Sequence, residues 1–131
     1  MLLSVLYISY MTKDYEKKEL DELMSVFYLN NMKHDISGLL LYSNKNVLQY
    51  IEGDLDKIEK LYNNIQNDNR HKSIITLYKK EIQQREFPHW VAKINYVNYN
   101  DFIDFAELSS LKDTKLNKLF HSFIITNRIS N

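Results

Sequence analysis

The sequence predicts an α+β fold in which strands and helices alternate along a chain of 131 residues. Five short segments rich in apolar residues are typical of strands, and two longer segments between them have apolar residues at helical spacing. This gives the order β-α-β-β-α-β-β, a ferredoxin-like core with one extra strand. We expect a mostly five-stranded mixed sheet, two helices on one face, and two C-terminal helices capping the other.

The first strand is expected to be central, because both of its faces are largely apolar. A helix should follow, then a hairpin, then a second helix for which Asp54 is the expected N-cap. Pro88 should form a turn before the last strand. The expected strands are residues 2–9, 36–42, 46–51, 73–82 and 89–97, and the expected helices are residues 15–30 and 55–68.

The C-terminal segment has an amphipathic pattern of its own. Asn100 could cap a short helix carrying Phe102, and Asp113 could cap a second helix with apolar residues at i, i+3, i+4, i+7 and i+8. We therefore divide the chain into a core of residues 1–97 and a helical cap of residues 98–131 within the same globular unit.

Composition excludes several classes of protein. The 17 basic and 17 acidic residues balance, so we expect no general attraction to nucleic acid or to anionic membranes. A net charge near zero does not oppose association of the chain with copies of itself. No run of 18 apolar residues predicts a membrane span, and the N-terminus lacks a signal-peptide pattern, so we expect a cytoplasmic protein.

The scarce residue types narrow the chemistry further. The chain has no cysteine, which excludes disulfides, thiolate metal sites and cysteine nucleophiles. Its two glycines cannot form the glycine-rich loops that bind nucleotides in Rossmann or P-loop proteins. The four histidines show no metal-ligand spacing, so no metal site is expected.

Gln49 is the most informative single residue, because it lies within an apolar run. A buried amide needs polar partners, and leaving it without them costs about 1–3 kcal/mol. Taken singly, each candidate has a simpler interpretation. Tyr7 could be a packing residue, Gln49 could lie at a sheet edge, Asn30 and Asn31 could end a helix, and Arg70 with His71 could offset a helix dipole.

Together, four motifs resemble the BLUF family, the sensors of blue light using FAD. They are YIS at residues 7–9, NNMKHDISGLLLY at 30–42, LQYIEG at 48–53 and NDNRH at 67–71. The resemblance extends over roughly residues 2–94 and includes the segment REFPHW at 85–90.

The resemblance implies a non-covalent flavin, FAD with FMN possible, held between the first two helices. Leu23 and Ile65 would flank the ring, and Asn30 and Asn31 would bind its pyrimidine edge. Gln49 would bridge the flavin and the hydroxyl of Tyr7. The residues implied near the ribityl and phosphate end are Asp68, Arg70 and His71.

It also implies a photochemical cycle. Tyr7 is expected to supply an electron and a proton to the excited flavin, and Gln49 is expected to relay the proton because an amide both donates and accepts. The amide would end rotated or tautomerised, and an added hydrogen bond to the flavin would shift its absorption to the red.

One position departs from the family. A methionine usually follows two residues after the tryptophan, and here that residue is Ala92. Because alanine lacks the reach and the polarizable sulfur of methionine, either a neighbour fills the gap or the output route differs. We expect Trp90 to lie near the flavin and to change little on illumination.

We therefore interpret the chain as a short, single-domain photoreceptor without an attached enzyme, which signals through contact with an unknown downstream protein and forms a homo-oligomer. The alternative is a light-insensitive ferredoxin-like module that binds a ligand or a protein. A small enzyme of the acyl phosphatase kind would need a glycine-bearing anion loop, which the sequence lacks.

Overall fold

The protein is described by a computed structural model that covers residues 1–94 and 112–127. Five strands form one sheet in the order β4-β1-β3-β2-β5. All neighbouring strands are antiparallel except β2 and β5, which are parallel, so the sheet is mixed as predicted. The strands are β1 (Leu2–Met11), β2 (Ser37–Ser43), β3 (Asn46–Asp54), β4 (His71–Ile82) and β5 (Trp90–Ile94).

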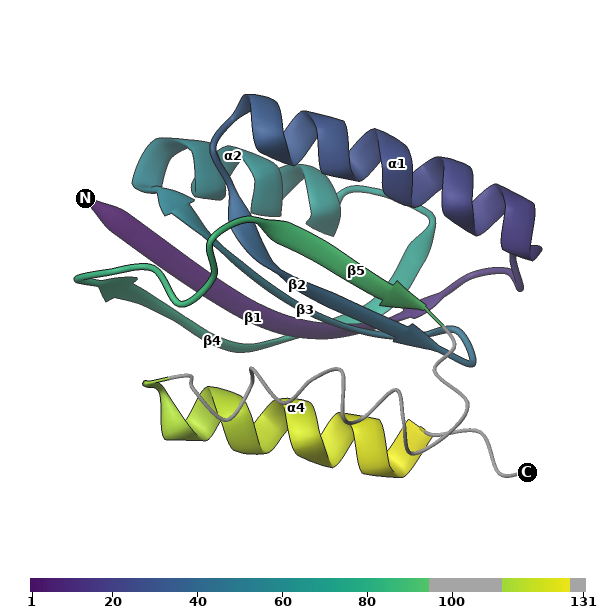
Figure 1. Ribbon diagram of the computed structural model, residues 1–131. Coiled ribbons are helices and arrows are strands. Elements are labelled where there is room, and N and C mark those ends of the chain that lie inside the picture. Colours follow the sequence, from purple (N-terminus) through teal and green to yellow (C-terminus); the bar gives the residue numbers. More distant parts are fainter. Residues whose placement is uncertain (95–111, 128–131) are drawn as a thin grey trace.

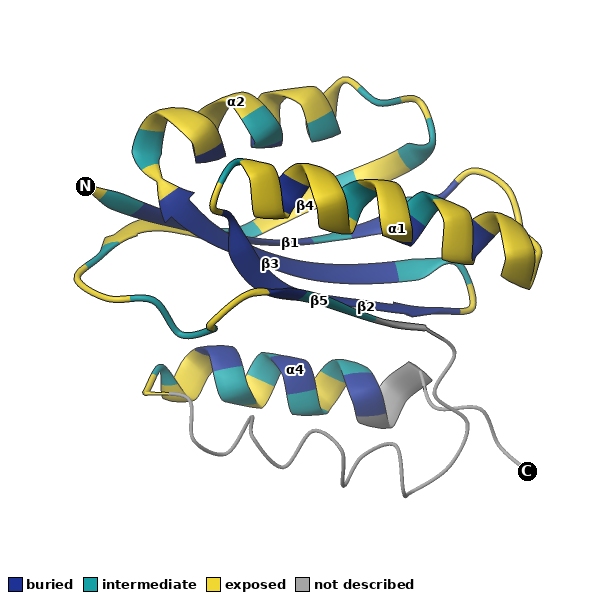
Figure 2. Cartoon of the chain, turned by 45° about the horizontal axis from the view of Figure 1, so that its top comes forward, coloured by how far each residue is buried: buried dark blue, intermediate teal, exposed yellow. Residues whose placement is uncertain are grey.

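The helices form two outer layers (Figure 1). Helices α1 (Lys17–Lys33) and α2 (Leu55–Gln66) lie side by side on one face of the sheet, and α4 (Thr114–Asn127) covers the other face. Strands β1, β2 and β3 are largely buried, whereas the edge strand β4 and the outward sides of the helices are largely exposed (Figure 2). The ferredoxin-like α+β prediction is therefore confirmed.

Alternation along the central strands divides the core between the two faces. Leu6, Leu48 and Tyr50 pack against the buried residues Leu116 and Phe120 of α4. The intervening positions of β1 and β3 point toward α1 and α2, where two further clusters are buried. The interior position predicted for the first strand is confirmed, since β1 pairs with β3 on one side and β4 on the other.

Some predicted boundaries were wrong. Helix α1 ends at Lys33 with His34 as its C-cap, so Asn30 and Asn31 lie inside its last turn and do not cap it. Asp54 is the N-cap of α2, but its side chain makes no capping hydrogen bond. Helix α2 ends at Gln66, before Asp68. The helix predicted after Asn100 lies outside the described residues, as do residues 95–97 of the last predicted strand.

The cap predicted at Asp113 is confirmed. Its carboxylate Oδ1 accepts a hydrogen bond from the backbone N–H of Leu116 at 3.0 Å, in the first turn of α4. Gly38 is a second position at which residue type determines the local structure. A Cβ added there would lie 2.0 Å from the carbonyl oxygen of Tyr50, so only glycine lets β2 approach β3 this closely.

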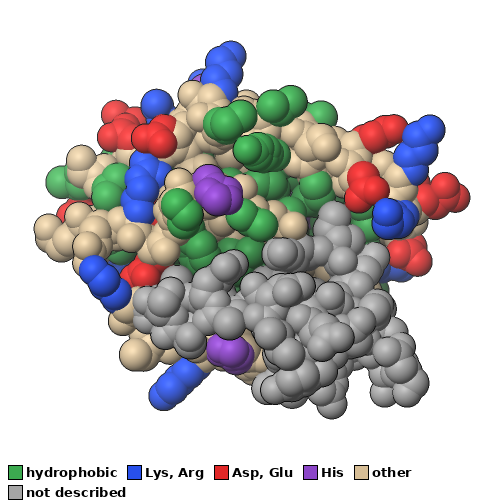
Figure 3. Space-filling model, in the orientation of Figure 1, with side chains coloured by type: hydrophobic (Ala, Val, Ile, Leu, Met, Phe, Trp, Pro, Cys, Tyr) green, Lys and Arg blue, Asp and Glu red, His purple; other side chains and the backbone are tan. Residues whose placement is uncertain are grey.

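The outward side of α1 is unusually apolar. Hydrophobic side chains are visible over the upper part of the face in Figure 3, where α1 lies. Four of them are exposed: Val26, Tyr28, Leu29 and Met32. Within the described residues, no helix is both long and apolar enough to cross a membrane.

Candidate functional site

Tyr7 and Gln49 lie directly opposite each other on the paired central strands β1 and β3. Both side chains point to the face covered by α1 and α2, and both are buried, with exposures of 1% and 6%. The amide Nε2 of Gln49 donates a hydrogen bond to the hydroxyl of Tyr7 at 2.5 Å. The polar partner that Gln49 required is therefore Tyr7.

The other end of the Gln49 amide faces Trp90 on β5. The indole Nε1 of Trp90 donates to Oε1 of Gln49 at 3.0 Å, and both residues are buried. An indole N–H can only donate, so the amide oxygen must face it and the amide nitrogen must face Tyr7. Trp90 therefore fixes the orientation of Gln49 in this structure.

These residues border a cavity between α1 and α2. Its volume is about 220 Å³, and Tyr7 and Gln49 form part of its wall on the sheet side. The full lining is Tyr7, Phe27, Asn30, Asn31, Leu40, Gln49, Leu61, Asn64, Ile65, Asp68, Arg70 and His71. The region between the helices is therefore hollow, which a flat ring requires.

The chemistry of the lining fits a flavin ring. Apolar side chains such as Phe27, Leu61 and Ile65 can cover the faces of a flat heterocycle, while amides can bind its polar edge. Asn31 is only 4% exposed, and its side-chain amide makes no hydrogen bond within the described part of the chain. The amide of Asn31 opens onto the cavity and is not sealed inside the protein, so it is available to a bound ligand.

Burial determines the protonation of Tyr7. Loss of solvent raises the pKa of its hydroxyl far above the ordinary value, and the hydrogen bond from Gln49 opposes this only in part. The phenol is therefore neutral at pH 7 and still carries its proton. The ring is held by neighbouring rings, with its centroid 5.5 Å from that of Tyr62 and 6.4 Å from that of His71.

Asp68 and Arg70 form an ion pair at the cavity. The guanidinium Nε of Arg70 lies 3.0 Å from both carboxylate oxygens of Asp68, and its Nη2 lies 2.5 Å from Oδ2. The hydrogen bonds from Arg70 lower the pKa of the Asp68 carboxyl, although burial opposes this. Burial lowers the pKa of His71, whose Nδ1 lies 2.9 Å from the hydroxyl of Ser9.

The predicted cofactor residues converge on this cavity with one exception. Leu23 is partly buried one turn before Phe27, in a cluster with Met24 and Trp90, and does not line the cavity. Ala92 packs partly buried against the same cluster. The lining residues absent from the prediction are Phe27, Leu40, Leu61 and Asn64.

For three of these four, their position relative to a predicted site residue places them on the same side of the fold, although it does not show that they face a cavity. Phe27 lies one helical turn after Leu23, and Leu61 lies one turn before Ile65 on the same side of α2. Leu40 is the cross-strand partner of Gln49. Within residues 1–94 and 112–127, no group of three or more His, Cys, Asp or Glu residues could hold a metal ion.

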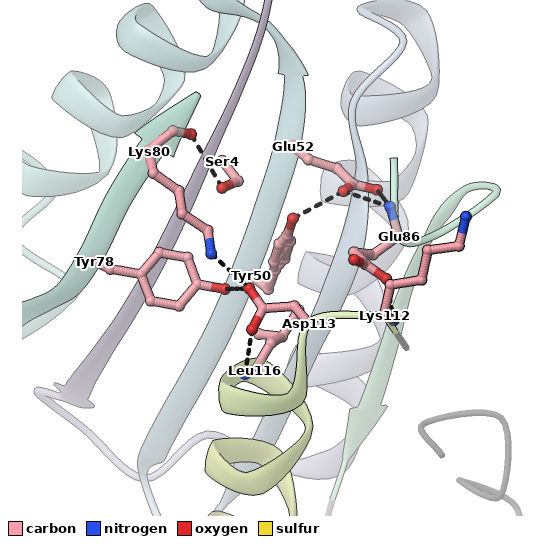
Figure 4. A network of polar contacts seen from close by, with 9 residues as sticks. All are labelled: Ser4, Tyr50, Glu52, Tyr78, Lys80, Glu86, Lys112, Asp113 and Leu116. Atoms are coloured by element: carbon pink, nitrogen blue, oxygen red, sulfur yellow. Dashed lines mark hydrogen bonds and ion pairs between the residues drawn. The ribbon is translucent and has the colours of Figure 1, made fainter. Parts of the chain in front are cut away.

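A second polar cluster lies nearer α4 (Figure 4), and although several of its residues fall within the quoted motifs, no role was predicted for them. The Glu52 carboxylate of β3 is fully buried. It accepts hydrogen bonds from the Tyr50 hydroxyl at 2.9 Å, the Ser37 hydroxyl at 2.8 Å, and the backbone N–H groups of Glu86 and Phe87 at 2.8 Å each. Glu52 therefore fastens the loop between β4 and β5 to the middle of the sheet.

Comparisons with known proteins agree with this geometry. The chain is 30% identical over 87 residues to the blue light- and temperature-regulated antirepressor BluF of Escherichia coli, a match that covers 66% of this chain and 22% of that protein. It is 33% identical over 87 residues to photoactivated adenylate cyclase subunit beta of Euglena longa, covering 66% of this chain and 10% of that one. The matched segment is thus a small part of these relatives.

A solved structure shows the same fold. The Klebsiella pneumoniae protein BlrP1, solved with FMN and cyclic diGMP, aligns with a TM-score of 0.79 and 24% identity over 95% of this chain and 35% of that chain. The sequence model of the family described as sensors of blue light using FAD matches residues 2–93. That family is defined by light sensing and not by catalysis. This chain belongs to the BLUF family of blue-light photoreceptors that use FAD.

Proposed function

We propose that this chain senses blue light through a flavin bound between α1 and α2, with Tyr7 and Gln49 as its photochemical residues. The observation that carries the proposal is the hydrogen-bonded series Tyr7–Gln49–Trp90, of which Tyr7 and Gln49 line the interhelical cavity and Trp90 lies behind Gln49. FAD is the cofactor that the family uses, and FMN is compatible with the same ring pocket.

The bound flavin would absorb the light and, once excited, accept an electron. Tyr7 is the donor, because its phenol borders the cavity and retains its proton. Loss of an electron makes a phenol strongly acidic, so Tyr7 must release that proton. Gln49 directs its Nε2 donor at this hydroxyl and its Oε1 at Trp90, so it would take up the proton only after the amide turns to present its oxygen to Tyr7.

Other lining residues would hold the ring. Asn30 and Asn31 would bind its polar edge, and Ile65 of α2 would cover one side of the ring. Leu23 of α1 would flank the other side from just outside the cavity lining. Asp68, Arg70 and His71 would face the ribityl side of the ring. Because Arg70 is already paired with Asp68, this group is preorganised and brings little net charge to the pocket.

The test is the light-induced spectral shift. Tyr7→Phe and Gln49→Leu should each retain flavin yet lose the reversible red shift, because one removes the donor hydroxyl and the other removes the relay. Tyr42→Phe is the matched control, since Tyr42 is equally buried but lies away from the cavity. An unchanged photocycle in either site variant would refute the scheme, and a colourless wild-type protein would refute flavin binding.

The response of Trp90 to light distinguishes two possible rearrangements of the Gln49 side-chain amide. If Gln49 rotates fully, its Nε2 meets the indole N–H and two donors face each other, so Trp90 must move. If Gln49 keeps an acceptor toward the indole, Trp90 stays in place. We predict the second outcome, so illumination should change Trp90 fluorescence only slightly, and a large change would contradict it.

Signal output is proposed to use protein contacts. The relatives are named for an antirepressor and for cyclases, so their blue-light segments accompany different outputs. We propose that residues 1–97 sense light, that residues 98–131 form a cap in the same unit, and that the chain acts in the cytoplasm on a protein partner. Packing of Leu116, Phe120 and Ile124 under the sheet supports a shared unit.

We also propose that the chain forms a homo-oligomer. The exposed apolar side of α1 supports this, because burying Val26, Leu29 and Met32 against a second copy removes apolar area from water. Light scattering during size-exclusion chromatography measures the mass. Wild type should elute above the monomer mass, and Leu29→Glu should shift it toward the monomer; a monomeric wild type would contradict the proposal.

A further inference from the structure

A second cavity opens beside the first, between the same two helices. Its volume is about 260 Å³. The two cavities share three lining residues, Asn30, Leu61 and Asn64, so they adjoin along the gap between α1 and α2. Ligand sites usually occupy about 300–1,000 Å³, which the first cavity alone does not reach and the two together do.

The second cavity differs from the first in charge. On the α2 side it is lined by Lys57 and Lys60, which lie three residues apart on one helix face, and on the α1 side by His34. No carboxylate is among its described lining residues. Neither lysine forms an ion pair within residues 1–94 and 112–127, so both charges are uncompensated there.

The first cavity, by contrast, has a cation that is already neutralised. Three contacts from Nε and Nη2 of Arg70 to Asp68 leave less of the guanidinium free for an anion. Lys57 lies in the first turn of α2, where Asp56 and the N-cap Asp54 already offset the helix dipole, so the attraction for an anion rests on the two lysines. Anion affinity is therefore concentrated in the second cavity.

We propose that the second cavity binds the phosphate end of the flavin nucleotide, with Lys57 and Lys60 as its cationic ligands. This rests on the proposed function, since it assumes that the ring lies in the first cavity. The ribityl chain would then run from the side of Asp68, Arg70 and His71 along α2, past Asn64 and Leu61, into the second cavity. Flavin selection by this chain would follow from the number of phosphates, with the adenine contributing little.

The experiment titrates flavin-free protein with riboflavin, FMN and FAD and follows quenching of flavin fluorescence. In wild type, FMN and FAD should bind about tenfold more tightly than riboflavin, which lacks phosphate. The double variant K57Q/K60Q should lose this preference and leave riboflavin affinity unchanged, so riboflavin also reports that the pocket is intact. Raising ionic strength should weaken FMN and FAD but not riboflavin.

Two matched variants sharpen the test. K118Q removes an exposed lysine from α4 and should preserve the preference for phosphate. If R70Q removes that preference while K57Q/K60Q keeps it, the phosphate lies beside Arg70 and the proposal is overturned. Equal wild-type affinity for all three flavins also overturns it while leaving the ring site intact, whereas failure to bind any flavin overturns the proposed function itself.

Discussion

Gln49 and Tyr50 are neighbours on β3, yet they point into two very different environments. Gln49 faces α1 and α2 and borders a cavity. Tyr50 faces α4, where it packs with Leu116 and Phe120 in a filled cluster. The difference follows from strand geometry, which sends successive side chains to opposite faces of a sheet. We call the side of the sheet that faces α1 and α2 the hollow face, because a cavity lies there, and the side that faces α4 the filled face. Strand β3 contributes side chains to both.

The polar groups of the two faces differ in the same way. Glu52 is buried with its oxygens fully engaged by hydroxyl and backbone donors. Asn31 is buried beside the cavity with no hydrogen bond from its amide in the described part of the chain. Satisfied buried groups stabilise a fold, whereas unsatisfied ones cost stability unless a ligand completes them. The filled face thus maintains the structure, and the hollow face is prepared for a ligand.

Truncation of Phe120 should produce the largest effect. Phe120→Ala removes a fully buried ring from the filled face and should lower the free energy of unfolding by about 3–5 kcal/mol. Phe27→Ala on the hollow face should cost less, because Phe27 is only partly buried and already borders empty space. Urea unfolding of both variants in the flavin-free protein measures the difference, and equal losses would contradict the contrast between the faces.

Neutralising Glu52 should have a smaller effect. Three donors converge on its Oε2, so in Glu52→Gln the amide oxygen must remain there and the amide nitrogen must face the Tyr50 hydroxyl. We expect a loss of about 1–2 kcal/mol, because charge-assisted hydrogen bonds become neutral ones. Flavin affinity should stay the same. Glu81→Gln is the control, since Glu81 is exposed, and a change in flavin affinity for Glu52→Gln would show that the faces are coupled.

The hollow face was largely predictable from sequence, because its residues are chemically conspicuous. Gln49 is an amide among apolar residues, and the need for a partner led to Tyr7. The family spacing then supplied Asn31 and Arg70. The apolar lining was harder to predict, because Phe27 and Leu61 have the same sequence signal whether they face a cavity or a packed core.

The filled face was predictable only in outline. The spacing of Leu116 and Phe120 predicted an amphipathic helix and Asp113 predicted its start, but neither residue indicates where that helix docks. Glu52 belongs to the motif LQYIEG, but its burial was not predicted, since a glutamate at the end of a strand is usually exposed. Its partners Glu86 and Phe87 contribute backbone N–H groups, which carry no residue-specific signal in the sequence.

Replacing Asn31 should have the opposite effects to replacing Glu52: the stability should be kept, and the flavin affinity should fall. Asn31→Leu removes an amide that opens onto the cavity and has no side-chain partner in the described part of the chain, so the stability of the flavin-free protein should stay within about 1 kcal/mol of wild type. Flavin affinity should fall about tenfold, which corresponds to the loss of one good hydrogen bond. Urea unfolding and fluorescence titration measure the two quantities. A destabilised variant with unaltered flavin affinity would show that Asn31 is structural.

Weakening the contact that holds α4 on the sheet should have the smallest effect on the free energy of unfolding, and the size of this effect should depend on pH. Burial tends to raise the pKa of Asp113, but the hydrogen bonds from Lys80 and from the backbone of Leu116 outweigh it and lower the pKa below the ordinary 3.8. The unfolded chain therefore takes up this proton at higher pH than the folded chain, and the stabilisation is complete above pH 3.8 and lost as the pH falls through the lowered value.

Asp113→Asn retains a capping oxygen and loses the ion pair with Lys80, which is 2.7 Å long and half exposed on the lysine side. We expect it to cost about 0.5–1 kcal/mol at pH 7, and this difference from wild type should shrink toward zero in urea unfolding experiments at progressively lower pH. A difference that stayed constant down to the acid limit would mean that the charge of Asp113 does not help to hold α4 on the filled face.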